Sequence, residues 1–290
     1  MKLGVLPWRV GRGGLARWAR RLDQEVAKAA WSGAQLLVTA EYAALEPALG
    51  TSADTAPDLD AELARAIAGA DAALEAMRVV ARRHKVWLLP GTLPMRQDDG
   101  LVLNRAPLLD PDGRVAFQDK HVMTRFEAED WAIAAGAPPA VFDTDFGRIG
   151  IAICFDAEFP ALVRAQVEAG AWLILVPSCT DTAHGFARVR IAARARAMEN
   201  QCFVAVAPTV GAAPWCAALD INVGRAGIYG PVDRGFPADG ILAEGEMGAG
   251  EWIFADLDAA RLAAVRRDGA VRNHLSWPAP VPVPRPADFA

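Results

Sequence analysis

The sequence has few of the residues that bind metals or cross-link small folds. It contains four cysteines and four histidines in 290 residues, and these stand far apart, without a Cys-x-x-Cys pair. Such scattered residues lack the spacing of a zinc site and the pattern of a disulfide framework, so we expect no metal and no cofactor. We expect all four cysteines to be free thiols: Cys154, Cys179, Cys202 and Cys216.

Excess positive charge and long apolar runs are also missing. The 30 basic residues are outnumbered by 35 acidic ones, so no electrostatic footprint for nucleic acid exists. No apolar run approaches the roughly 20 residues that cross a bilayer. The N-terminus also lacks the long apolar segment of a secretion signal. We therefore expect a cytoplasmic protein that binds neither nucleic acid nor membrane.

Apolar strands and amphipathic helices alternate along the chain, which is typical of an α/β layered fold. Hydrophobic residues make up 53% of the sequence, enough for one large core. Segments 101–110 and 114–121 flank a turn and predict a β-hairpin, so the sheet should be mixed. We expect one domain over 1–270 and an extended, Pro-rich tail over 271–290. The other predicted strands are 2–8, 35–42, 86–93, 147–154, 172–178, 202–210 and 252–258, and the predicted helices are 15–32, 58–84, 160–170, 184–200 and 258–268.

Three predicted strands end in side chains that could react together. Cys154 ends a β-branched apolar run, Glu41 ends a second strand, and Lys120 ends a third. Ligand crevices of α/β sheets open at the carboxyl ends of strands. Each residue alone has an ordinary structural explanation, but together they supply a nucleophile, an acid and an ammonium group.

The segments around these three residues resemble the nitrilase superfamily of carbon–nitrogen hydrolases, which use a Glu-Lys-Cys triad. The resemblance runs from the first strand to about residue 275. One departure is Ala40, where the family more often has proline. The resemblance implies a four-layer α-β-β-α sandwich with mixed sheets and at least a homodimer. Its motifs here are LLVTAEY, DKHVMTRFEAEDW, GRIGIAICFDAEFPALVRAQVEAGAWLILVPS and RARAMENQCFV.

The resemblance also implies a reaction on a small molecule. Glu41 would be the general base, Cys154 the nucleophile, and Lys120 a donor to the oxyanion together with the backbone N–H of Phe155. The predicted activity is that of a small-molecule amidase acting through a thioester. A nitrilase and an N-carbamoyl amidohydrolase are the alternatives within the superfamily.

The resemblance also implies a further catalytic glutamate several residues after the lysine, which would orient the lysine and could assist the attacking water. Glu127, seven residues after Lys120, fits best, and Glu129 is the alternative. Both acids could instead belong to a solvated acidic loop. We expect Asp156 to be a structural carboxylate that caps its turn. The predicted substrate-binding residues around the pocket are Phe155, Glu158, Trp131, Thr180, His184 and Trp215.

Three other readings of the strand-end cysteine stay open. The protein could be a Cys–His hydrolase with His121 or His184 as the base, which would leave Glu41 and Lys120 without a task. It could be a redox sensor whose cysteine is oxidised to sulfenic acid. It could also be an inactive binding subunit with a nitrilase-like fold, although the presence of all three triad residues disfavours this.

Overall fold

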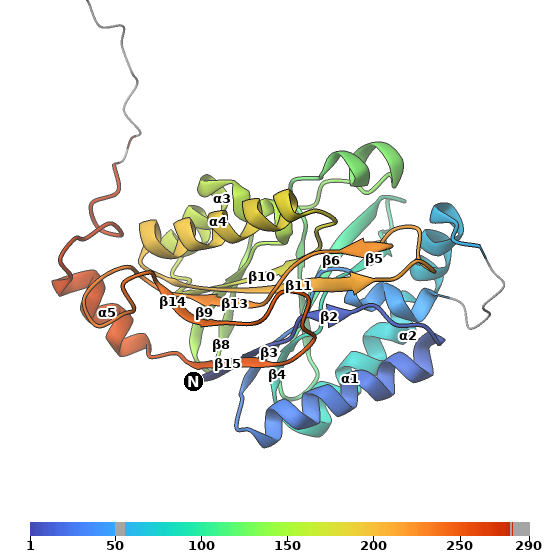
Figure 1. The fold of residues 1–290 in the computed structure, drawn as a ribbon, viewed down its shortest axis with the longest axis horizontal. Coiled ribbons are helices and arrows are strands. Elements are labelled where there is room, and N and C mark those ends of the chain that lie inside the picture. Colours follow the sequence, from blue (N-terminus) through green and yellow to red (C-terminus); the bar gives the residue numbers. More distant parts are fainter. Residues whose placement is uncertain (50–55, 279, 281–290) are drawn as a thin grey trace, which may run out of the picture.

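Two mixed β-sheets face each other, and helices cover the outer face of each sheet (Figure 1). The computed structural model describes residues 1–49, 56–278 and 280. Helices α1 and α2 lie on one side of the pair of sheets, and α3 and α4 lie on the other. The predicted four-layer α-β-β-α sandwich is confirmed. The longer helices are α1 Gly14–Trp31, α2 Leu59–His84, α3 Pro160–Glu168, α4 Ala183–Asn200 and α5 Ala259–Asp268.

The first sheet has the order β15-β1-β3-β4-β6-β5, with β7 paired to β6. Strands β1, β3 and β4 are parallel, whereas β6 runs antiparallel to both β4 and β7. Strand β7 therefore runs in the same direction as β3 and β4, and their carboxyl ends lie at one edge. The β6–β7 hairpin was predicted from the sequence. The strands of this first sheet are β1 Lys2–Val5, β3 Leu36–Val38, β4 Trp87–Leu89, β5 Leu93–Arg96, β6 Val102–Leu109, β7 Val115–Asp119 and β15 Ile253–Asp256.

The second sheet has the order β14-β13-β11-β10-β9-β8, and β2 and β12 both pair with β11. Its centre is parallel, since β10 pairs in parallel with both β9 and β11. The strands are β2 Trp8–Arg9, β8 Val141–Thr144, β9 Gly147–Ile151, β10 Leu173–Ser178, β11 Phe203–Ala212, β12 Ile221–Asn222, β13 Gly227–Tyr229 and β14 Ile241–Glu244.

Helices α2 and α4 begin at residues whose side chains cap them. The side chain of Asp58 accepts a hydrogen bond from the backbone N–H of Ala61 and caps α2. Thr182 caps α4 in the same way, and Pro160 occupies the first turn of α3. Such caps satisfy backbone N–H groups that a helix leaves unpaired, and each typically contributes about 1 kcal/mol.

A continuous hydrophobic core fills the space between the sheets. Val5 and Val38 of the first sheet belong to the same buried cluster as Ile151 and Val206 of the second. These four side chains are at most 2% exposed. Because this core is tightly packed, it fixes where each strand ends and so where the side chains after it lie.

Several strands differ from those expected. The first predicted strand is divided at Pro7 into β1 and β2, since proline cannot donate to a ladder. Strand β8 and the three short strands of the segment 211–245 were not predicted. These strands have two to four residues, too short for an alternating pattern to stand out.

The segment after α5 folds back onto the second sheet's helices. The guanidinium of Arg164 on α3 lies 4.6 Å from the ring centroid of Trp277 and donates to the carbonyl of His274. The remainder of the predicted tail, 279 and 281–290, lies outside the described residues. The boundary at 270 stays a prediction.

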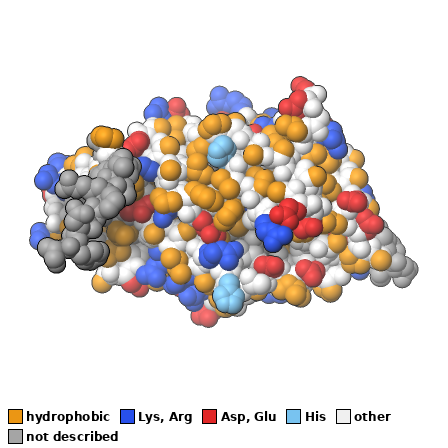
Figure 2. All heavy atoms as spheres, turned by 90° about the horizontal axis from the view of Figure 1, so that it is seen from above, with side chains coloured by type: hydrophobic (Ala, Val, Ile, Leu, Met, Phe, Trp, Pro, Cys, Tyr) orange, Lys and Arg blue, Asp and Glu red, His pale blue; other side chains and the backbone are white. Residues whose placement is uncertain are grey.

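The face formed by α3 and α4 carries exposed apolar side chains. Figure 2 shows hydrophobic side chains in a band across the middle of this view, with charged groups around it. On α4, Ile191 is 65% exposed and Met198 is 40% exposed. Among the described residues, no helix combines the length and apolar character needed to cross a bilayer.

Candidate active site

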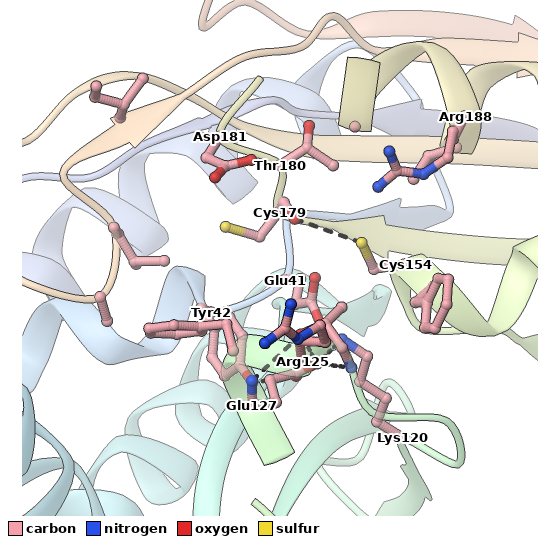
Figure 3. A pocket seen from close by; sticks show the side chains of 18 of the residues that line it. Glu41, Tyr42, Lys120, Arg125, Glu127, Cys154, Cys179, Thr180, Asp181 and Arg188 are labelled. Carbon is pink, nitrogen blue, oxygen red and sulfur yellow. Dashed lines mark hydrogen bonds and ion pairs between the residues drawn. The ribbon is translucent and has the colours of Figure 1, made fainter. Parts of the chain in front are cut away.

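A cavity of about 380 Å³ opens where strands of both sheets end (Figure 3). Glu41 follows β3, Lys120 follows β7, and Cys154 lies three residues after β9. All three line the cavity, together with Glu127 of the short π-helix η2, Phe126–Asp130. The fold therefore brings together four residues that are far apart in the sequence.

Cys154 begins a 3₁₀ helix, η3 Cys154–Glu158, at a strained turn. Its φ angle is +48°, in the left-handed region that residues other than glycine rarely adopt. Its side chain is 4% exposed, and its Sγ atom lies 3.5 Å from the carbonyl oxygen of Cys179. Strained backbone of this kind is concentrated at functional sites, where surrounding structure holds it in place.

Glu41 is buried, and one of its two carboxylate oxygens accepts two hydrogen bonds. Its Oε1 atom lies 2.8 Å from Nζ of Lys120 and 3.0 Å from Nδ2 of Asn104. Burial raises the pKa of Glu41 to about 7, although the charge of Lys120 acts in the opposite direction.

Lys120 lies between two carboxylates and is 2% exposed. Its Nζ atom donates to Glu41 and, at 2.6 Å, to Oε2 of Glu127. Burial alone would lower the pKa of this ammonium group, but the two carboxylates outweigh burial and hold the pKa above its ordinary value. Lys120 is therefore charged, and among the described residues these two carboxylates use two of its three Nζ hydrogens.

Glu127 is held by hydrogen bonds at both oxygens. Oε1 accepts from the hydroxyl of Tyr42 at 2.6 Å and from Asn104 at 3.3 Å. Oε2 accepts from Lys120 and from the backbone and hydroxyl of Thr124. Burial would raise the pKa of Glu127, but Lys120 and these donors hold it below its ordinary value. Glu127 therefore stays ionised near neutral pH, whereas Glu41, with a pKa of about 7, can gain or lose a proton there.

Burial and the nearby charge of Glu41 raise the pKa of the Cys154 thiol well above its ordinary value. The resting cysteine is consequently protonated near neutral pH. A protonated thiol is a weak nucleophile and needs a base when it reacts. In this cavity Glu41 is the carboxylate whose pKa suits that task.

Asp156 connects the segment after Lys120 to the turn that holds Cys154. Its carboxylate accepts from the backbone N–H groups of His121 and Val122. The sequence predicts that this aspartate caps its own turn, but its carboxylate oxygens accept hydrogen bonds from the loop that follows Lys120 instead. The imidazole of His121 lies 3.0 Å from the carbonyl of Gly136.

The six predicted substrate-binding residues divide into two groups. Phe155, Glu158 and Thr180 line the cavity. The other three are absent from its lining: Trp131, His184 and Trp215.

Each of these three residues has another environment. Trp131 is 1% exposed and packs behind Tyr42, with ring centroids 5.0 Å apart. His184 is exposed at the start of α4. Trp215 donates from Nε1 to the carbonyl of Gly11. A sequence does not show on which side of a loop an aromatic or imidazole side chain will lie.

Sequence reasoning missed several residues that line the cavity or hold its carboxylates in place. Asn104 interrupts an apolar strand with a buried amide, and this polar residue at a buried position was a signal that could have identified it. Tyr42 stands beside Glu41 and contacts the second glutamate. The segment 217–221 forms one wall of the cavity, but its residues have no chemical signature. The rim also includes the charged side chains of Arg125, Asp181, Arg188 and Asp220.

The acidic and thiol groups of the site do not form a metal centre. Over residues 1–49, 56–278 and 280, no group of three or more His, Cys, Asp or Glu side chains is arranged to hold a metal ion. The positive charge that pairs with the carboxylates of Glu41 and Glu127 is the ammonium group of Lys120.

The sequence and the fold are both similar to those of known proteins. The profile of the carbon-nitrogen hydrolase family matches residues 12–267. The chain belongs to this family. It is 39% identical over 177 residues to "Probable hydrolase YhcX" of Bacillus subtilis, covering 61% of this chain and 34% of that protein. It is 35% identical over 146 residues to the deaminated glutathione amidase of Yersinia enterocolitica, covering 47% and 51% respectively. The matched regions thus span between a third and about half of these relatives.

Solved structures of carbon-nitrogen hydrolases have the same fold. A mutant of the amidase from Nesterenkonia sp. AN1 superposes with a TM-score of 0.71 and 26% identity, covering 92% of this chain and 96% of that one. Acrylamide has added to its active-site cysteine. Nit3 of Saccharomyces cerevisiae, a nitrilase superfamily member, gives a TM-score of 0.73 at 20% identity over 92% and 93% of the chains, which shows the fold alone.

Proposed function

We propose that this protein hydrolyses the C–N bond of small, non-peptide amides through a thioester on Cys154. One observation carries the proposal. Lys120 and Asn104 both donate to Oε1 of Glu41, and this leaves Oε2 as the oxygen that can accept the thiol proton. A carboxyl group with a pKa of about 7 is suited to take up and release a proton at neutral pH.

The first half of the reaction forms the acyl-enzyme. Glu41 takes the thiol proton while the sulfur of Cys154 attacks the amide carbon, which becomes tetrahedral. Its oxyanion accepts from the third Nζ hydrogen of Lys120 and from the N–H of Phe155, which lies in the first turn of η3. Glu41 then gives its proton to the amide nitrogen, the C–N bond breaks, and ammonia or an amine leaves.

The second half restores the free enzyme. Glu41 takes a proton from a water molecule, whose oxygen attacks the thioester carbon. The C–S bond breaks, the proton returns to the thiolate, and a carboxylic acid is released. Glu127 touches none of the reacting atoms in this scheme. Its oxygens accept from Tyr42, Thr124 and Lys120, so Glu127 is fixed by the first two residues and in turn holds Lys120 in place.

The alternatives of other classes fit the site less well. A redox sensor needs an accessible cysteine with a low pKa, whereas Cys154 is 4% exposed and its pKa is raised. A Cys–His hydrolase needs an imidazole at the sulfur, but His121 and His184 are both missing from the cavity lining. The cysteine adduct of the Nesterenkonia amidase supports a nucleophilic role for the corresponding thiol here.

A substrate panel tests this proposal. Purified protein is incubated with small amides, nitriles and N-carbamoyl compounds, and ammonia and the acid product are quantified. We expect amides to be hydrolysed by the wild type and by Cys202→Ala, which removes a thiol of the core, but not by Cys154→Ala. Release of carbon dioxide with ammonia would instead indicate the carbamoyl alternative, and turnover of nitriles alone would indicate a nitrilase. Equal amide turnover by Cys154→Ala would disprove the mechanism.

Two further predictions concern the whole protein. The resemblance implies at least a homodimer, and the composition of the sequence predicts a cytoplasmic location. The exposed apolar residues Ile191 and Met198 on α4 support an association through this helix face. Light scattering coupled to size-exclusion chromatography measures the oligomeric state, and a monomer at micromolar concentration would contradict the prediction.

A further inference from the structure

One wall of the cavity is a single short segment. Residues 217–221 line the cavity consecutively, and the first three are the apolar side chains of Ala217, Ala218 and Leu219. They face the same space as Cys154 and Phe155. The acyl part of a bound substrate must pass along this wall, so the position of the wall sets how large that group can be.

A buried carboxylate outside the cavity holds the start of this segment. Glu62 lies in the first turn of α2 and is 1% exposed. Its oxygens accept from the backbone N–H of Ala217 at 2.9 and 3.0 Å, from that of Ala218 at 3.3 Å, and from the thiol of Cys216 at 3.3 Å. Glu62 is not among the residues that line the cavity.

The far end of the segment has a separate anchor. The side chain of Asn222 donates to the carbonyl of Leu219 at 2.7 Å and to that of Gly211 at 3.1 Å. Ala213 donates to the carbonyl of Asp220 at 2.7 Å and closes the loop. The wall is therefore fixed at its end by the second sheet and at its start by a helix of the first sheet's outer layer.

We propose that Glu62 is a positioning residue that sets the width of the substrate cavity by holding the backbone of residues 217 and 218. A buried carboxylate is stable only where donors surround it, so Glu62 and these N–H groups fix each other's position. Loss of the carboxylate leaves the N–H groups unpaired and lets the wall move. This inference rests on the proposed amidase activity, because the wall matters through the substrate that it contacts.

The effect should appear in substrate binding and in size selectivity, not in the chemical step. In Glu62→Gln the amide NH₂ replaces one acceptor and faces an N–H donor, so the wall loses part of its support. We expect KM for a small amide to rise about tenfold with kcat changed less than about threefold, as for an interaction that is lost from binding alone. Asp60→Asn, an exposed carboxylate in the same turn of α2, is the matched control and should leave both constants unchanged.

A second measurement does not depend on turnover. Iodoacetamide and a bulkier N-substituted iodoacetamide alkylate Cys154, and the ratio of their rates reports the width of the cavity. We expect this ratio to change in Glu62→Gln and to stay at the wild-type value in Asp60→Asn. Should Glu62→Gln fail to fold, Glu62→Asp keeps the charge with a shorter reach and should change the ratio in the same direction.

The outcomes separate this inference from the proposed function. An unchanged alkylation ratio in a folded Glu62 variant would overturn the positioning role, whether or not the protein hydrolyses amides. A fall in kcat at constant KM would overturn it as well. A wild-type protein that is alkylated at Cys154 by iodoacetamide but hydrolyses none of the amides would count against the proposed function alone.

Discussion

Nδ2 of Asn104 lies 3.0 Å from Oε1 of Glu41, the same oxygen that accepts from Lys120. The same amide nitrogen lies 3.3 Å from Oε1 of Glu127, and the backbone carbonyl of Asn104 accepts from the N–H of Lys120 at 2.9 Å. One buried residue of β6 thus donates to both carboxylates and also accepts from the backbone of Lys120. In the proposed mechanism this leaves the second oxygen of Glu41 for the thiol of Cys154.

Removal of the Asn104 amide should impair the base without removing it. In Asn104→Leu, Glu41 loses a donor and can rotate, so we expect kcat/KM for an amide to fall about 10- to 100-fold, the range expected for a lost hydrogen bond to a charged group. In Asn104→Asp, a third carboxylate would raise the pKa of Glu41 further. The acid limb of the pH profile should then move to higher pH.

Gln118→Leu is the matched control for Asn104. Gln118 is a buried amide of the neighbouring strand β7 whose partners are the carbonyl of Asp119 and the N–H of Ala140. Its loss should lower the melting temperature but leave the pH midpoint in place. If both variants shifted the midpoint equally, Asn104 would have no special role.

The pH dependence of activity follows from the raised pKa of Glu41. Glu41 must be ionised to accept the thiol proton, and its pKa is about 7. As the pH falls through 7 the ionised fraction falls, so kcat/KM should decrease, and well below the pKa it should decrease about tenfold per pH unit. Steady-state kinetics between pH 5 and 9 measure this, with circular dichroism to show that the fold persists. A flat profile through pH 7 would exclude Glu41 as the base.

The two acids of η2 should differ sharply in their effects. Glu127 is 2% exposed and pairs with Lys120, whereas the side chain of Glu129 is 56% exposed and pairs with Arg125 at the surface. Glu127→Gln removes a charge that holds Lys120, so we expect kcat to fall at least 100-fold, as for loss of a group that places an oxyanion donor. Glu129→Gln should leave kcat within about twofold, since surface pairs contribute little. Comparable losses in both variants would contradict the assignment of Glu127.

The sequence predicted the centre of the site because strand ends have a recognisable pattern. The runs before Glu41 and Cys154 are apolar and the residues after them are polar, as expected where a buried strand ends at a ligand crevice. The two strands belong to different sheets, and both residues line the same cavity. The hairpin that places Lys120 was also predicted, since its turn is rich in aspartate, proline and glycine.

The rest of the cavity depends on contacts that the sequence does not encode locally. Trp131 is a large aromatic residue at the end of η2, yet it is buried and packs against Tyr42 and does not line the cavity. The wall at 217–221 has no regular periodicity, and its position depends on Glu62, which is more than 150 residues away in the chain. Such long-range anchors become visible only in three dimensions.

The central claim is that Cys154 carries the acyl group during amide hydrolysis and that Glu41 activates it. The most direct measurement is peptide mass spectrometry of protein quenched in acid during turnover, for the wild type and for Glu41→Gln. We predict that the wild-type peptide containing Cys154 gains the mass of the acyl group and that Glu41→Gln gains none from the same amide. Steady release of ammonia with Cys154 unmodified, or equal acylation of both proteins, would contradict the account.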